Sequence, residues 1–338
     1  MVRVEKSLSR WTTGVKFLIM LESYKMALLK RAGTFVTLLV ILTAISSPDA
    51  AAQTEGLIKR DGLDLHYRII GKGQPILLLS GGPGIDAGYL TPVAKELAKT
   101  SQCILLEQRG TGRSRPKTYT PANINLKLCL DDLEALRSAL KLEKWSIFGH
   151  SWGGMLGMAY AGAHPERVDA LILASSGGMT LDFFEYFSDN IHSRLYPSDL
   201  EAERKWANPA LRKANPARAS MEDLKAVAPG YFFNRQNVKK LTSGIRLDTL
   251  NSQVFQLLVQ DLSQHGYDLR PGLKMFNRPV LIIQGRQDPI GEATAYETRK
   301  TLVGASLQFI NKCGHFPWME QPEQFYAILT KFLKQPRT

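Results

Sequence analysis

Cysteine is scarce in this sequence, with three residues among 338: Cys103, Cys129 and Cys313. Their spacing matches no metal-binding pattern, and we expect no metal site. Cys103 opens an apolar run and Cys129 lies in a leucine-rich segment, which favours buried thiols. An oxidising compartment would permit one disulfide among the three, but the sequence does not select the pair.

Blocks of like charge are also missing. The net charge of +12 is spread along the chain without a dense Lys/Arg run, so we predict no nucleic-acid partner. The lysine-bearing phosphate-loop pattern is missing as well, although glycines follow an apolar run at residues 81–84. Pro83 has no N–H to offer a phosphate, and nucleotide binding is therefore not predicted.

The apolar run near the N-terminus, Gly33–Ile45, has 13 residues. A membrane-spanning helix needs about 20 residues, so this run is too short for a stable anchor. Basic residues precede it at 30–31 and small residues follow it at 50–52, which is the layout of a secretory signal peptide.

We therefore predict an N-terminal extension over 1–52 that contains a signal peptide over 26–52. Cleavage near Ala52 would export the protein to a periplasm or out of the cell, with no stable membrane anchor. The true start stays open between three methionines: Met1, Met20 and Met26.

Short apolar runs alternate with segments of helical periodicity along the rest of the chain. The runs are apolar on both faces, as in a parallel sheet that helices cover on both sides. This alternation predicts a mostly parallel, doubly wound α/β sheet. The predicted strands occupy residues 65–70, 76–79, 103–107, 145–149, 170–175, 279–285 and 307–311. The turn pair Asp61-Gly62 predicts a hairpin before the first of these runs.

Residues 178–274 break this alternation, because they are aromatic and charged and contain no clear buried strand. We interpret them as a helical cap inserted after the sixth strand. The α/β core would then comprise residues 53–177 and 275–338.

The segment Gly149-His150-Ser151-Trp152-Gly153 is the strongest chemical signal. It matches the G-x-S-x-G pattern and lies between a predicted strand and a predicted helix, the context that a nucleophile elbow requires. Glycines at both flanks remove Cβ atoms that would clash in so sharp a turn. Ser151 is therefore the predicted nucleophile.

A serine nucleophile needs a base, and the base needs an acid to orient it. His315 follows the last predicted strand and Asp288 follows the strand before it, so both lie at the sheet edge where Ser151 is expected. Glu292 is a weaker alternative acid. Asp131 and Asp132 suit the positive end of a helix start instead.

The remaining histidines compete poorly for the role of base. His150 is expected to pack behind the elbow, and two others lie in the cap. Backbone N–H groups of Gly82 and Trp152 are predicted to form the oxyanion hole. This chemistry needs no metal or organic cofactor.

These motifs resemble those of the α/β-hydrolases, and most closely those of the proline iminopeptidase branch. The matching segments are Gly81-Gly82-Pro83-Gly84, "EQRGTGRS" at 107–114, the elbow with "HPERV" behind it, and the Asp288 and His315 segments. They cover about residues 55–178 and 275–335. Members of the branch usually have His at the position of Ser80 and Asp at that of Glu107.

The resemblance implies an α/β-hydrolase fold and an aminopeptidase-like activity on small N-terminal residues of a small-molecule or short-peptide substrate. It also implies a cap glutamate that holds the substrate's amine, for which Glu185 is the best candidate. A carboxylesterase or lactonase acting on small, partly apolar esters is the alternative. A more remote alternative is an inactive binding protein on the same fold. The sequence leaves the oligomeric state open.

Aromatic residues of the cap are candidates to line the substrate site. They are Phe183, Phe184, Tyr186, Trp206, Tyr231 and Phe232.

Overall fold

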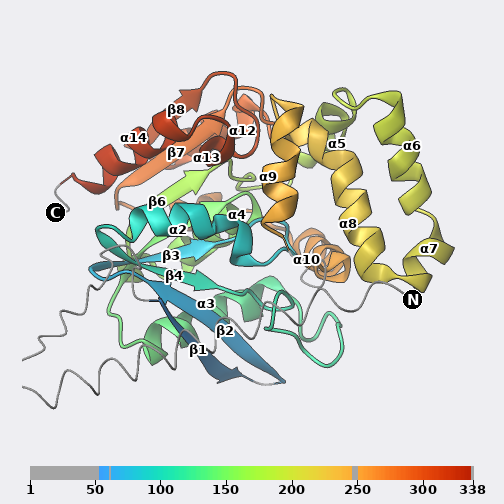
Figure 1. The fold of residues 1–338 in the computed structure, drawn as a ribbon. Coiled ribbons are helices and arrows are strands. Elements are labelled where there is room, and N and C mark those ends of the chain that lie inside the picture. The colour runs from blue at the N-terminus through green and yellow to red at the C-terminus, as the bar shows by residue number, and fades with distance from the viewer. Residues whose placement is uncertain (1–52, 61, 246–249, 336–338) are drawn as a thin grey trace, which may run out of the picture. The chain divides into compact units, whose positions relative to one another are not determined.

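The computed structural model describes residues 53–60, 62–245 and 250–335 (Figure 1). The signal peptide predicted at 26–52 lies outside these residues. Within the described ranges, no helix is both long enough and apolar enough to cross a membrane.

The described residues form an eight-stranded sheet with the strand order β1-β2-β4-β3-β5-β6-β7-β8. Strands β1 to β2 and β2 to β4 pair antiparallel, and every later pair is parallel. The predicted mostly parallel sheet and the N-terminal hairpin are confirmed. The strands are β1 (Gln53–Arg60), β2 (Leu63–Ile70), β3 (Gln74–Leu79), β4 (Ser101–Leu106), β5 (Trp145–His150), β6 (Val168–Ala174), β7 (Val280–Gly285) and β8 (Ser306–Ile310).

The two faces of the sheet each bury an apolar layer. In β3, Leu77 and Leu79 point into one hydrophobic cluster, while Ile76 and Leu78 point into the other. Successive side chains of a strand point to opposite faces, so a strand that is apolar throughout has to be covered on both sides.

Helices supply both covers. The helices α2 (Thr91–Leu97) and α14 (Pro322–Leu333) contribute to one cluster. The other cluster contains residues of α3 (Leu126–Ala139), α4 (Trp152–Ala163) and α12 (Glu292–Thr301). This two-sided cover gives the sheet the doubly wound α/β architecture that the alternation of strands and helices predicted.

Every described element between β6 and β7 is helical, as predicted for the cap, and Figure 1 shows α5 to α9 grouped beside the sheet. Three of these helices begin with a proline at their first position, where the missing N–H costs no hydrogen bond. The helices are α5 (Phe184–His192), α6 (Pro197–Trp206), α7 (Pro209–Ala214), α8 (Pro216–Val227), α9 (Val238–Ser243), α10 (Ser252–Gln264) and α11 (Arg270–Leu273).

Helix α10 packs with the core although the sequence assigned it to the cap. Its residues Val254, Leu258 and Leu262 are buried in the same cluster as α3 and α4. The carboxylate of Asp261 also accepts a hydrogen bond of 2.8 Å from the backbone N–H of Leu126, at the start of α3. The core therefore holds helix α10 of the insertion directly.

Asp132 has a different role from the helix-start role predicted for it. It lies in the second turn of α3, is 1% exposed, and accepts hydrogen bonds of 2.8 and 2.6 Å from the guanidinium of Arg109. Arg60 donates a third, of 3.0 Å. The ion pair of Arg109 and Asp132 connects the loop after β4 to α3. The local sequence did not reveal that Asp132 is buried, and its role therefore differs from the predicted one.

We predict that Asp132→Ala lowers the free energy of unfolding by about 3–5 kcal/mol, because it leaves the buried charge of Arg109 unpaired. The neighbouring Asp131→Ala is the matched control. Its ion pair with Lys127 is exposed, so its loss should cost about 1 kcal/mol or less. Urea denaturation of both variants measures the difference, and equal costs would contradict a structural role for the buried pair.

Candidate active site

Ser151 joins β5 to α4 in a backbone conformation that side-chain-bearing residues rarely adopt. Its φ is 56° and its ψ is −121°. The turn is held in place because the Ser151 N–H donates to the carbonyl of Ala174 at 3.2 Å and its own carbonyl accepts from Gly154 at 2.9 Å. Strain of this kind persists only where the surroundings enforce it.

The flanking glycines are required by the geometry. A Cβ at Gly149 would lie 2.4 Å from the carbonyl oxygen of Gly153, and a Cβ at Gly153 would lie 2.2 Å from that of Leu79. Both distances are far inside van der Waals contact. The steric reason for G-x-S-x-G therefore applies at both positions of this chain.

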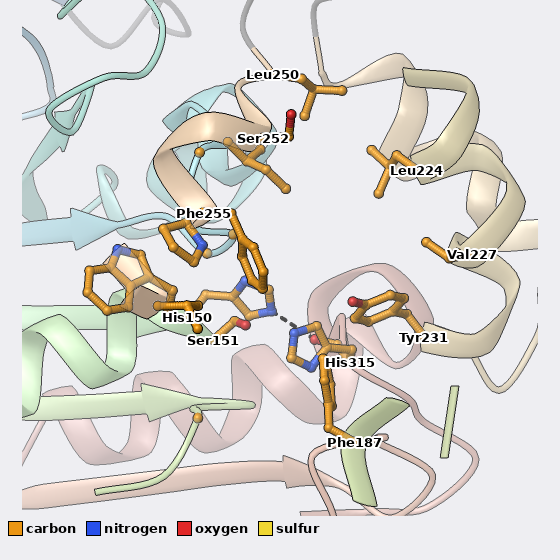
Figure 2. A pocket seen from close by; sticks show the side chains of 18 of the residues that line it. His150, Ser151, Phe187, Leu224, Val227, Tyr231, Leu250, Ser252, Phe255 and His315 are labelled. Atoms are coloured by element: carbon orange, nitrogen blue, oxygen red, sulfur yellow. Dashed lines mark hydrogen bonds between the residues drawn. The ribbon is translucent and has the colours of Figure 1, made fainter. Parts of the chain in front are cut away.

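The structure brings the three predicted triad residues together at one edge of the sheet. His315 Nδ1 lies 2.9 Å from Asp288 Oδ1, and both side chains are almost fully buried. The same carboxylate oxygen accepts a 3.0 Å hydrogen bond from the N–H of Ile290, which orients it. Figure 2 shows Ser151 and His315 next to each other beside the cavity.

The alternative acid does not reach this site. Glu292 forms a partly exposed ion pair with Arg286 at 2.8 Å. The base, in contrast, is also held from the cap, because the N–H of His315 donates to the carbonyl of Tyr231 at 2.7 Å. The cap thus contributes to placing the imidazole.

The two residues predicted to supply the oxyanion N–H groups, Gly82 and Trp152, both belong to the cavity wall. Neither N–H donates a hydrogen bond to any group in the described part of the chain. Trp152 begins α4, where the first N–H groups of a helix have no internal partner. Gly82 has a φ of 119°, a conformation that favours glycine.

Gln108 braces this loop from one side, a role that the sequence motifs did not indicate. Its amide nitrogen donates to the carbonyl of Ser80 at 2.9 Å, and its amide oxygen accepts from the Trp152 indole at 2.9 Å. Ser80, which stands where the resemblance implies His, donates its hydroxyl to the carbonyl of Ile85 at 2.8 Å. The shorter side chain therefore holds the loop by a direct hydrogen bond.

Glu107, the other departure from the family pattern, also organises its loop. Its carboxylate accepts hydrogen bonds from the backbone N–H and the guanidinium of Arg113, the latter at 2.8 and 3.0 Å. Arg113 in turn pairs with Glu55 of β1 at 2.9 Å. The longer acid thus keeps the loop after β4 attached to the hairpin.

A cavity of about 430 Å³ opens above Ser151. Three of the predicted lining residues, Phe183, Phe184 and Tyr231, do line it. Figure 2 shows Leu224 and Val227 of α8 on the facing wall. The cavity is therefore mostly apolar around the reacting groups.

Three predicted aromatic liners lie elsewhere. The hydroxyl of Tyr186 is 2.8 Å from that of Thr294, so this ring packs on α12. Phe232 is buried and stacks on Phe316, with 4.9 Å between ring centroids. Trp206 lies outside the cavity wall, with the guanidinium of Arg218 over its ring.

The prediction for Glu185 is not supported either. This residue is exposed in the first turn of α5 and does not line the cavity. Helical periodicity explains the error, because α5 turns Phe183, Phe184 and Phe187 inward and leaves Glu185 on the outer side.

Asp223 is the one carboxylate of the described residues that lines the cavity away from the triad, and Arg212 lies beside it. The guanidinium of Arg212 and the carboxylate of Asp223 are 3.0 Å apart. Burial raises the pKa of Asp223 from its ordinary value. The cavity thus holds one acid whose charge is already paired.

The three cysteines are free and buried. Burial raises the pKa of the Cys103 and Cys129 thiols to about 12, so both are protonated and unreactive at neutral pH.

Comparisons with known proteins agree with this geometry. Residues 74–322 match the family model described as alpha/beta hydrolase fold. The chain is 26% identical over 295 residues to a proline iminopeptidase of Lactobacillus acidophilus, a match that covers 82% of this chain and 97% of that protein.

Among solved structures, the chain is similar to Est816, described as an N-acyl homoserine lactone degrading enzyme. The TM-score is 0.60 with 23% identity, and the match covers 82% of this chain and 100% of the other. An enol-lactonase from Burkholderia xenovorans is also similar, with a TM-score of 0.56, 20% identity, and coverage of 83% of this chain and 100% of that one. At these identities the likeness shows the fold alone.

We predict that Gly153→Ala costs at least about 2 kcal/mol of unfolding free energy, because the new methyl group would overlap the Leu79 carbonyl. Gly162→Ala, in the same helix, is the control. Its Cβ would meet nothing closer than 3.6 Å, and alanine favours a helix by about 0.5–1 kcal/mol. The midpoint of thermal or urea unfolding should therefore fall for Gly153→Ala and rise for Gly162→Ala. Midpoints that shift in the same direction would refute the steric argument.

Proposed function

Because the chain belongs to the α/β-hydrolase fold family, we propose that it is a serine hydrolase acting through an acyl-enzyme. The observation that carries this proposal is the strained Ser151 beside the buried pair of His315 and Asp288. Ser151 Oγ attacks the substrate carbonyl while His315 Nε2 takes the hydroxyl proton. Asp288 holds the proton on Nδ1 and stabilises the imidazolium that forms.

The rest of the cycle uses the same groups. The N–H groups of Gly82 and Trp152 bind the oxygen that becomes negative in the tetrahedral intermediate. His315 then gives its proton to the departing alcohol or amine, which leaves the acyl group on Ser151. Water, deprotonated by His315, attacks the ester, and the acid product and free Ser151 are released.

We propose a small, uncharged and partly apolar acyl group as the preferred substrate. The cavity wall supports this choice, since it is built mostly of apolar side chains such as Phe184, Leu224 and Tyr231. Its single acid away from the triad is neutralised by Arg212. Desolvating a substrate ammonium there would cost free energy that no unpaired carboxylate offsets.

An aminopeptidase acting on small N-terminal residues is the second candidate. The identity to a proline iminopeptidase over most of both chains favours it. In that case Asp223 would have to leave Arg212 and face the substrate's amine, since Glu185 is on the outer side of α5.

We predict that Ser151→Ala lowers kcat by about 10⁴–10⁶-fold and abolishes labelling by a fluorophosphonate probe. Asp288→Asn should lower kcat by about 10⁴-fold through loss of the correct His315 tautomer. Ser193 is exposed, and Ser193→Ala serves as the control, which should keep both the wild-type kcat and the labelling by the probe. A wild-type protein that the probe does not label would instead favour a binding protein without catalysis.

The substrate class is tested by comparing proline p-nitroanilide with its N-acetyl form, p-nitrophenyl butyrate and a small lactone. We expect kcat/KM for the N-acetyl anilide, which has the same leaving group, to exceed that for the free amine by at least about tenfold, or about 1.4 kcal/mol. A preference for the free amine that Asp223→Asn removes would establish the aminopeptidase instead.

A further inference from the structure

Three buried hydrogen bonds connect the loop of Gly81 and Gly82, the proposed oxyanion loop, with the loop of His315. The N–H of Gly81 lies 2.6 Å from the hydroxyl oxygen of Tyr89. That oxygen lies 2.7 Å from Nδ1 of His150, and Nε2 of His150 lies 2.9 Å from the carbonyl oxygen of His315. Tyr89 is 2% exposed and His150 is 1% exposed. Figure 2 shows the last of these bonds as a dashed line.

The chemistry of the two end groups sets the direction of every bond. The Gly81 N–H can only donate and the His315 carbonyl can only accept. Nε2 of His150 must therefore carry a proton, and the hydroxyl of Tyr89, which accepts from Gly81, donates its own proton to Nδ1. The arrangement is complete only with a neutral imidazole protonated on Nε2.

The surroundings keep His150 in this state. Burial holds the pKa of His150 well below its usual range, and the nearby His315 disfavours a second positive charge. The two imidazole rings are 4.7 Å apart. Trp318 stacks on Tyr89 with 6.1 Å between ring centroids and meets His150 edge-on with 4.8 Å between centroids. These contacts restrict both rings of this hydrogen-bonded chain from Gly81 through Tyr89 and His150 to His315, which we call the relay.

We propose that Tyr89 and His150 are positioning residues that set the spacing between the oxyanion loop and the catalytic base. This inference rests on the proposed function, because it assigns the relay to the reaction at Ser151. His150 directly precedes Ser151, and its ring is hydrogen-bonded to Tyr89 on one side and to the backbone of His315 on the other. The ring therefore fixes the positions of the nucleophile, the base and the loop relative to one another.

The position of the relay in the loop explains why it would affect the reaction. Gly81 directly precedes Gly82, which lines the cavity, so a shift of the Gly81–Gly82 peptide moves the proposed oxyanion donor, the N–H of Gly82. The loop is also packed tightly, since a Cβ at Gly81 would lie 2.9 Å from Ser151 Cβ. Gln108 braces the other side at Ser80, so loss of the relay should loosen the loop without unfolding it.

The decisive variant is Tyr89→Phe, which removes one oxygen and keeps the ring. It leaves the Gly81 N–H and His150 Nδ1 without a partner. We expect kcat to fall by about 10- to 100-fold, since a displacement of about 1 Å at a reacting site can cost about 10²-fold. KM should change by no more than about twofold, and the rate of fluorophosphonate labelling should fall in parallel with kcat.

The control is Tyr160→Phe, another fully buried tyrosine, whose hydroxyl bonds to Glu134 away from the loop. It should leave kcat within about twofold of wild type. His150→Leu should reduce kcat at least as much as Tyr89→Phe, and the double variant should be no worse than His150→Leu alone. His150→Gln, whose amide keeps one donor and one acceptor, should recover part of the loss.

The proposed role of the relay would be refuted if the losses in kcat at Tyr89 and His150 multiplied in the double variant as independent effects do. It would also be refuted if Tyr89→Phe left kcat unchanged. Both outcomes differ from a failure of the proposed function. In that case wild-type turnover would persist in Ser151→Ala, whatever the relay variants do.

Discussion

The backbone of Ser151 is the constraint on which the rest of the site depends. A residue with a side chain at φ 56° and ψ −121° is strained by about 1–3 kcal/mol, and the surrounding fold must enforce it. The sheet does so because β5 lies at its centre and both faces are buried. Gly149 and Gly153 then follow as steric necessities, since any Cβ there would meet a backbone carbonyl.

Parallel strands gather the remaining groups at the edge where Ser151 emerges. Asp288 and His315 follow β7 and β8, so segments far apart in the sequence meet beside one hydroxyl. The loop after β3 is held from two sides, by Gln108 and by Tyr89. In the proposed reaction, the hydrogen-bond donors of this loop would be in place before a substrate arrives, which is the condition for efficient stabilisation of an oxyanion.

The cap forms much of the cavity wall above Ser151. It places apolar side chains over Ser151 and pairs Asp223 with Arg212, while Glu185 faces away. This arrangement supports the proposed preference for neutral acyl groups, although the sequence relatives include proline iminopeptidases. The cap also contacts the predicted base, because the carbonyl of Tyr231 holds the backbone of His315. The cap therefore both lines the cavity and holds the loop of His315.

The sequence by itself determined the resemblance to the α/β-hydrolases, the order of strands and helices, and the candidate residues Ser151, Asp288 and His315. These signals are local, since strand period, helix period and glycine positions act within a few residues. Only the tertiary structure decided which cap side chains face the cavity, as the exposed Glu185 shows. It alone revealed the buried pair of Asp132 with Arg109 and the relay through His150. The bonds from Arg109 to Asp132 and from His150 to Tyr89 and to His315 join residues 23 to 165 positions apart, and no local pattern encodes them.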